Sequence, residues 1–186
     1  HLDTDAMEKA RGITIFSKMA RFAYGDAEYV LLDTPGHADF TAEMERTLSV
    51  LDYAILVISG IDGVQGHTRI LWKLLQNYNV PCILFINKMD VSHRGKEELL
   101  SHLQEKLADA CMDFGAFYGN APMSDRDKEH IALCSEPLLD AFLNTGDLDQ
   151  KLLVEAIAKR QIFPVLFGSA LKVQGVKELL RLMQDY

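Results

Sequence analysis

The stretch Ile83-Leu84-Phe85-Ile86-Asn87-Lys88-Met89-Asp90 joins a run of large apolar residues directly to a polar cluster. An apolar run with no alternating polar residues is typical of a strand buried on both faces of a sheet. In open α/β sheets, ligands bind beyond the carboxyl ends of such strands. The stretch therefore predicts a buried parallel strand with functional polar residues immediately after it.

Short apolar runs and longer helical patterns alternate along most of the chain. This alternation is typical of a mostly parallel sheet covered by helices. The chain has 186 residues, of which 48% are hydrophobic, enough for one domain with a buried core. We therefore expect a three-layer α/β fold, with residues 54–58 in a central strand. The expected strands are residues 29–33, 53–59, 81–87 and 162–168, and the expected helices are residues 38–51, 67–78, 95–111 and 173–184.

A hairpin is expected near the N-terminus, where residues 13–22 and 29–33 flank the turn signal Gly25-Asp26. These two segments should pair antiparallel.

The segment from about residue 112 to residue 162 breaks the alternation. Asn120-Ala121-Pro122 and Ser124-Asp125 are typical of loops, and helical patterns follow at residues 136–143 and 149–159. We interpret the segment as a helical and irregular insertion into a single domain that spans residues 1–186.

Composition argues against several classes of protein. The net charge of −8 and the pI near 5.2 disfavour DNA binding or any broad nucleic-acid footprint, which needs clustered Lys and Arg. The cysteines, Cys82, Cys111 and Cys134, have the spacing of neither a disulfide framework nor a zinc site. The sequence has no apolar run of membrane-spanning length and no leader pattern. We expect a cytoplasmic protein without a membrane partner.

Asp33-Thr34-Pro35-Gly36-His37 directly follows a predicted strand. In nucleoside triphosphatases, an Asp at this place holds Mg²⁺ and a Gly lets a backbone N–H approach the γ-phosphate. His37 would then lie beside the attacking water. The alternative is a surface turn that uses the same residue types.

Asn87-Lys88-Met89-Asp90 follows a second predicted strand. The carboxylate of Asp90 can accept two hydrogen bonds from N1–H and the exocyclic amine of guanine, a donor pair that adenine lacks. A strand exit with a helix cap is the alternative. Gly168-Ser169-Ala170-Leu171 follows a third strand, and its small residues allow backbone N–H groups to approach a base. Three motifs at the ends of three parallel strands together favour a nucleotide site.

Arg11-Gly12-Ile13-Thr14 leads into the first segment of the expected hairpin. The hydroxyl of Thr14 can ligate Mg²⁺ and its backbone N–H can sense a γ-phosphate. The alternative is a Thr selected for its β propensity, beside a solvated Arg11.

Together with Asp62-Gly63-Val64-Gln65 and Thr68-Arg69-Ile70-Leu71, these motifs resemble the G domain of translational GTPases of the elongation factor G class. The resemblance covers nearly the whole chain. Within that class, the chain most resembles tetracycline-resistance ribosomal protection proteins. The resemblance rests on Leu48-Ser49-Val50-Leu51-Asp52, on the same two segments at residues 62–65 and 68–71, and on the intermediate length of the interval from Asp90 to Ser169. Elongation factor G and peptide release factor three are the alternatives within the class.

The resemblance implies binding and hydrolysis of GTP, with GTP/GDP and Mg²⁺ as ligands and the ribosome as partner. It implies that Thr14 and Asp33 hold Mg²⁺ and that Gly36 lies at the γ-phosphate. It also implies that His37 positions water near the large-subunit RNA of the GTPase centre. The residues implied to hold guanine are Asn87, Lys88, Asp90, Ser169, Ala170 and Leu171.

One element of the family pattern is missing. The sequence contains no Gly-x-x-x-x-Gly-Lys-Ser/Thr, which supplies the backbone cradle, the lysine and the first Mg²⁺ hydroxyl of a phosphate loop. In this family the loop follows the first strand, in the middle of the sheet. We interpret the chain as an N-terminally truncated G domain of the P-loop NTPase type that lacks this strand. We expect it to be inactive or nearly so, and to be unstable, rearranged or swapped with a second copy.

Two other functions stay open. The missing phosphate loop favours a binding module for guanine nucleotide or protein that does not hydrolyse GTP. An unrelated α/β enzyme of the flavodoxin type is the third alternative, but it leaves the order of the motifs unexplained.

Overall fold

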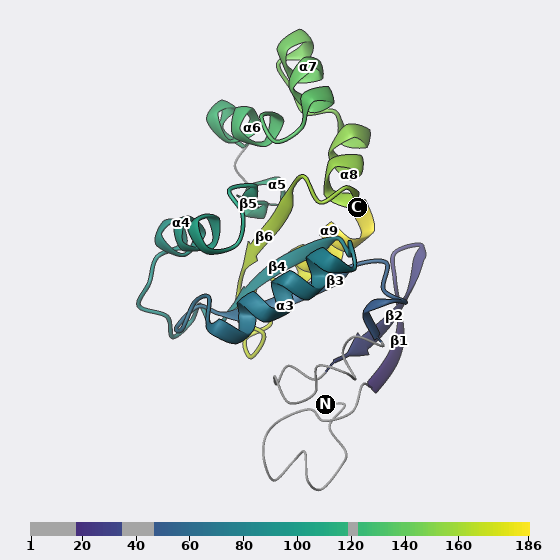
Figure 1. Cartoon of the computed structure of the whole chain (residues 1–186), viewed down its shortest axis with the longest axis vertical. Helices are drawn as coiled ribbons and strands as arrows, with labels where there is room; N and C mark the ends of the chain where they lie inside the picture. Colours follow the sequence, from purple (N-terminus) through teal and green to yellow (C-terminus); the bar gives the residue numbers. More distant parts are fainter. Residues whose placement is uncertain (1–17, 35–46, 119–122) are drawn as a thin grey trace, which may run out of the picture.

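The computed structural model describes residues 18–34, 47–118 and 123–186 (Figure 1). None of the helices in these ranges is long and apolar enough to cross a lipid bilayer. The strands are β1 (Lys18–Tyr24), β2 (Ala27–Asp33), β3 (Ala54–Ser59), β4 (Cys82–Asn87), β5 (Cys111–Asp113) and β6 (Phe163–Phe167). The helices are α3 (Gly66–Asn77), α4 (Lys96–Lys106), α5 (Gly115–Tyr118), α6 (Asp125–Ala132), α7 (Glu136–Thr145), α8 (Gln150–Ala158) and α9 (Val176–Asp185).

The main sheet has four parallel strands in the order β3-β4-β6-β5. Strand β4 pairs with β3 on one edge and with β6 on the other. Its residues 83–86 are between 0% and 4% exposed. The prediction of a parallel strand buried on both faces is therefore confirmed for this stretch.

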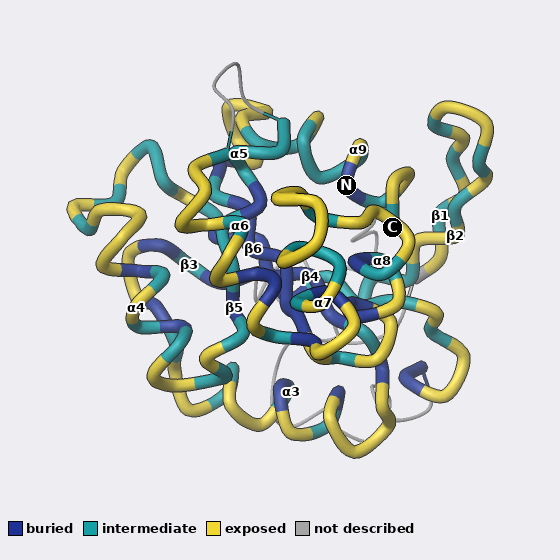
Figure 2. Tube along the Cα trace, turned by 90° about the horizontal axis from the view of Figure 1, so that it is seen from above, coloured by how far each residue is buried: buried dark blue, intermediate teal, exposed yellow. Residues whose placement is uncertain are grey.

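Helices cover both faces of this sheet, which gives the three expected layers. Along β4, Leu84 and Ile86 pack with α3 and α4, whereas Ile83 and Phe85 pack with the helices of the other face. Figure 2 shows the buried segments gathered around β4 and β6, with exposed helix surfaces outside them. The first layer contributes Trp72, Leu75, Leu99 and Leu103, and the opposite layer contributes Phe114, Ile131, Leu138, Leu153, Ile157 and Leu182.

Strands β1 and β2 form a separate two-stranded ribbon rather than an extension of the main sheet. They pair antiparallel from Lys18 opposite Asp33 to Tyr24 opposite Ala27, with Gly25 at a φ of 58° in the turn. This confirms the predicted hairpin. A cavity of about 760 Å³ separates the ribbon from β3, β4 and α9. Its apolar lining includes Met19, Phe22, Val30, Leu31, Leu32, Ile55, Ile83 and Met183.

The position of β3 differs from the expectation that it is central. Among the described residues β3 pairs only with β4, so it is an edge of the sheet. Leu56 and Ile58 are buried on one face, but Val57, on the opposite face, is 58% exposed. A continuous apolar sequence indicates burial on both faces, yet the strand becomes central only if another strand pairs with its second edge.

Some element boundaries also differ from the expectations. Helix α4 ends at Lys106 rather than at the expected residue 111. A turn follows, in which the N–H of Cys111 donates to the carbonyl of Ala108, and it leads into β5. The short β5 was not expected. Helix α6 was not expected either: Ser124-Asp125 is typical of loops, but Ser124 caps the helix by accepting a hydrogen bond from the N–H of Asp127. Most of the helix expected at residues 38–51 lies outside the described residues.

We expect the ribbon and the edge of β3 to make the chain prone to self-association. An edge strand with unpaired backbone groups is a template for pairing with another chain, and a charged side chain on it disfavours such pairing. Size-exclusion chromatography should show dimers or larger species whose proportion falls in Val57→Lys. Thermal melting of the wild-type chain should show a low or broad transition.

The matched control is Leu143→Lys, which replaces another exposed apolar residue, on α7. Its elution should match that of the wild type. A monomeric wild-type chain with a cooperative, high-temperature transition would contradict the prediction.

Candidate functional site

Three loops meet at one edge of the main sheet. They follow β3, β4 and β6, whose carboxyl ends lie together because the strands are parallel and adjacent. The loops comprise residues 60–65, 88–95 and 168–175. The parallel pairing thus brings together two of the motifs predicted from sequence, at the edge where open α/β sheets bind ligands.

The side chain of Asn87 fastens the second loop to the third. Its Oδ1 accepts hydrogen bonds from the N–H of Lys88, at 2.8 Å, and from the N–H of Ala170, at 2.9 Å. A backbone bond from the N–H of Met89 to the carbonyl of Gly168, at 3.0 Å, lies beside them. Lys88 adopts a φ of 64°, a conformation that non-glycine residues rarely use. The hydrogen bonds of Asn87 therefore fix the relative position of these two loops without a ligand.

The carboxylate of Asp90 is the main charged group of this edge. Its side chain is only 9% exposed, and its Oδ2 lies 3.5 Å from Nζ of Lys172. The hydroxyl of Ser169, which belongs to a buried residue, and the ammonium of Lys172 hold the pKa of Asp90 below its ordinary value, against the opposing effect of partial burial. Asp90 is thus ionised at neutral pH and can accept hydrogen bonds.

The loop after β6 is a tight turn closed on itself. Ser169 and Gln174 exchange backbone hydrogen bonds of 3.0 and 2.9 Å. The N–H of Lys172 donates to the carbonyl of Ser169, at 3.2 Å, and Gly175 takes a φ of 77°. Leu171 lies at the tip with 89% of its surface exposed. The turn presents Ser169 inward, toward Asp90, and Leu171 outward.

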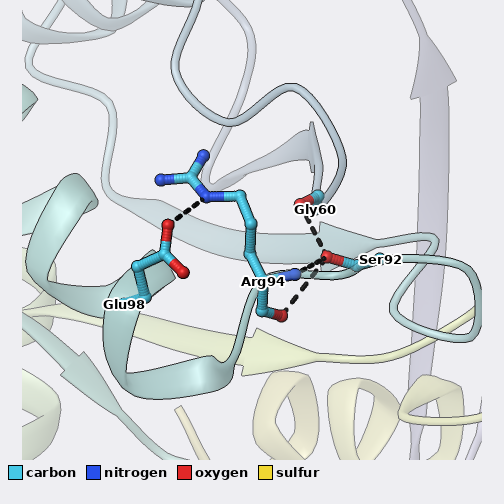
Figure 3. Close-up of polar contacts among 4 residues, drawn as sticks. All are labelled: Gly60, Ser92, Arg94 and Glu98. Carbon is cyan, nitrogen blue, oxygen red and sulfur yellow. Dashed lines mark hydrogen bonds and ion pairs between the residues drawn. The ribbon is translucent and has the colours of Figure 1, made fainter.

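The loop after β3 is tied to the loop after β4 by Gly60 and Ser92 (Figure 3). The N–H of Gly60 donates to the carbonyl of Asn87, at 2.7 Å, and its carbonyl accepts from the hydroxyl of Ser92, at 2.9 Å. Ser92 also accepts from the N–H of Arg94, at 3.1 Å, and Arg94 pairs with Glu98 at 2.7 Å. Sequence reasoning missed Ser92, because its partner Gly60 is distant in the chain and no motif joins them.

The remaining predicted residues are not brought to this edge by the described structure. Thr14, Gly36 and His37 lie outside the described residues, so their roles stay predictions. Asp33 ends β2, in the separate ribbon. Within residues 18–34, 47–118 and 123–186, no three His, Cys, Asp or Glu side chains are grouped as a metal site would require.

We expect Gly168→Ala to destabilise the turn that carries Ser169. A Cβ at this position would collide with the carbonyl oxygen of Gln174 and come within 2.8 Å of the Phe85 ring. Because the backbone carbonyl cannot move without opening the turn, we expect a loss of about 1–3 kcal/mol in the free energy of unfolding, measured by urea denaturation.

Gly66→Ala is the matched control, since a Cβ there meets nothing within 4 Å. It should leave the unfolding midpoint nearly unchanged. Equal midpoints for the two variants would show that the turn tolerates a side chain at Gly168.

Comparison with known proteins agrees with this arrangement of strands and loops. Residues 1–186 match the family described as elongation factor Tu GTP binding domain. The chain is 37% identical, over 187 residues, to the tetracycline resistance protein TetM of Streptomyces lividans, with 94% of this chain and 29% of that protein covered. It is 33% identical, over 228 residues, to elongation factor G of Gluconobacter oxydans (strain 621H), with 99% of this chain and 33% of that protein covered.

A solved structure from Thermus thermophilus has the same fold. Its TM-score is 0.83 at 21% identity, and the match covers 99% of this chain and 34% of that one. The chain therefore spans about a third of the length of these relatives. Since the family match extends over every residue, the chain belongs to the family of elongation factor Tu GTP binding domains.

Proposed function

We propose that the chain is the guanine-nucleotide-binding part of a ribosome-associated translational GTPase of the elongation factor G class and ribosomal protection type. The observation that carries this proposal is the ionised Asp90 carboxylate beside the turn at Ser169, with Asn87 bonding the two loops together. In this proposal residues 1–186 form one partial G domain, with an insertion at about residues 112–162. The longer protein hydrolyses GTP and acts in the cytoplasm.

Base recognition follows from the chemistry of Asp90. A carboxylate accepts two parallel hydrogen bonds, which matches the N1–H and exocyclic amine of guanine and discriminates against adenine. The hydrogen bond from the N–H of Ala170 to Oδ1 of Asn87 holds the two loops together beside Asp90. Lys88 and Leu171 are exposed beside them and complete the proposed base-binding surface.

The phosphate and metal contacts are proposed from the sequence. Thr14 and Asp33 would hold Mg²⁺, Gly36 would contact the γ-phosphate and His37 would orient water, with stimulation by ribosomal RNA of the large subunit. Bound GTP and Mg²⁺ supply the phosphoryl group and its charge neutralisation. The contribution of His37 would be to the transition state rather than to nucleotide affinity.

The type of GTPase is supported by the lengths of the alignments. The match to TetM spans 187 positions, nearly the length of this chain, whereas the match to elongation factor G needs 228. We propose that the difference lies in a shorter interval between the Asp90 and Ser169 motifs. Ribosome binding and antibiotic protection are proposed by analogy with relatives that are named tetracycline resistance proteins and elongation factors.

A second candidate is a binding module that recognises guanine nucleotide or protein without hydrolysis. Its base-binding edge would be the same, with Asp90 beside the turn at Ser169. Titration with a fluorescent guanine nucleotide and Mg²⁺ separates the two candidates. We expect the chain alone to show no submillimolar affinity, because the phosphate loop supplies much of the binding. Guanine-selective, submillimolar binding would favour the module.

We expect Asp90→Asn to change base preference away from guanine in the longer protein. An amide presents one acceptor and one donor where the carboxylate presents two acceptors, so the exocyclic amine of guanine loses its partner. Competition of GDP and xanthosine diphosphate for the labelled nucleotide should show GDP weakened by about tenfold or more, the cost of one unsatisfied polar contact.

Asp147→Asn is the control, because Asp147 is an exposed carboxylate paired with Lys128, away from the three loops. Its GDP affinity should equal that of the wild type. Unchanged GDP affinity in Asp90→Asn would remove Asp90 from base recognition.

A further inference from the structure

The ion pair between Asp90 and Lys172 joins a shielded carboxylate to an accessible cation. The Asp90 side chain is 9% exposed, whereas that of Lys172 is 55% exposed. A carboxylate with so little access to solvent needs a donor or a cation beside it. Lys172 supplies that positive charge. It lies on the exposed turn that also carries Leu171.

The backbone of Lys172 is fixed, but its side chain has room to move. Its N–H donates to the carbonyl and to the hydroxyl of Ser169, at 3.2 and 3.3 Å, within the turn closed by Gln174. A lysine ammonium is strongly hydrated and sits on a flexible four-carbon stem. The head group can therefore leave Asp90 for solvent while the turn keeps its shape.

We propose that Lys172 is a placeholder cation for Asp90, which competes with the guanine base for the same carboxylate and swings into solvent when the base binds. The inference rests on the proposed function, because it takes Asp90 to be the group that reads the base. Lys172 then tunes the affinity of the site for the base. It keeps the carboxylate ionised and oriented, and it is displaced most readily by a ligand that offers two hydrogen-bond donors at once.

The physical argument concerns the difference between the two bound states of Asp90. In one, the carboxylate has the ammonium at 3.5 Å and the hydroxyl of Ser169. In the other, the N1–H and amine of guanine provide two directional hydrogen bonds, and the released ammonium regains its hydration. A base with a single donor, such as adenine, cannot replace the cation equally well. Competition by Lys172 lowers the affinity of any base that must displace it, so only a base with two donors binds appreciably.

The test is a titration of the chain with millimolar guanosine, followed by NMR, in the wild type and in Lys172→Met. At these concentrations the chemical shifts report base binding that is weaker than the submillimolar affinity the chain alone is expected to lack. Guanosine carries the base without phosphates, so the measurement is independent of a phosphate cradle. Lys172→Met keeps the length of the side chain and removes its charge. We expect this variant to bind guanosine about two- to fivefold more tightly, the effect of losing competition from a partly exposed ion pair.

A second measurement follows the NMR signals of the Lys172 side chain. In the wild type, the side-chain carbon and nitrogen signals of Lys172 should move toward those of a free lysine as guanosine is added. Lys172→Arg keeps the charge and should not bind guanosine more tightly than the wild type. Lys177→Met, which removes an exposed lysine on α9, should bind with wild-type affinity.

The outcomes separate this inference from the proposed function. Guanosine binding that is equal or weaker in Lys172→Met overturns the placeholder role but leaves guanine recognition intact. Guanosine that binds neither protein, or binds no better than adenosine, overturns base recognition by Asp90 and the placeholder role with it. Tighter binding by Lys172→Met, with movement of the Lys172 signals in the wild type, supports both.

Discussion

Burial of β4 on both faces and pairing on both of its edges is the constraint that organises the molecule. Leu84 and Ile86 anchor one layer of helices, and Ile83 and Phe85 anchor the other. Because β3 and β6 pair with β4 in parallel, the chain leaves all three strands at the same edge. Loops that are far apart in sequence are neighbours for this reason, and polar residues in them can act as one site.

The site itself depends on polar groups that bind one another across these loops. Asn87 uses its side-chain oxygen to hold Ala170, and Gly60 is bonded through its N–H to Asn87 and through its carbonyl to Ser92. Such bonds are worth little when exposed and more when partly buried, since unsatisfied partners are then costly. They position Asp90 beside Ser169, where a shielded carboxylate stays ionised.

Between the ribbon and β3 lies a cavity, whereas the core around β4 is closely packed. Apolar side chains from β2, β3 and α9 line about 760 Å³, and no described strand bridges the two sheets. Among the described residues, no strand pairs with the outer edge of β3 or joins β3 to the ribbon. A backbone group costs on the order of 1–3 kcal/mol if it is buried unpaired. The loops that carry Asp90 and Ser169 lie in the other part of the domain, where the strands pair through β4.

Local sequence was enough to predict the α/β class, the hairpin, the strands β2, β3, β4 and β6, and the family, because apolar runs and motif order are local properties. It also placed Asn87, Asp90 and Ser169 at strand ends. The folded arrangement was needed to establish that β3 lies at an edge, that Cys111 begins a strand and that Ser92 bonds Gly60. It likewise revealed the pairing of Lys172 with Asp90. These features arise from contacts between segments distant in the chain, and no local pattern encodes which partner a strand edge, a hydroxyl or an ammonium will meet.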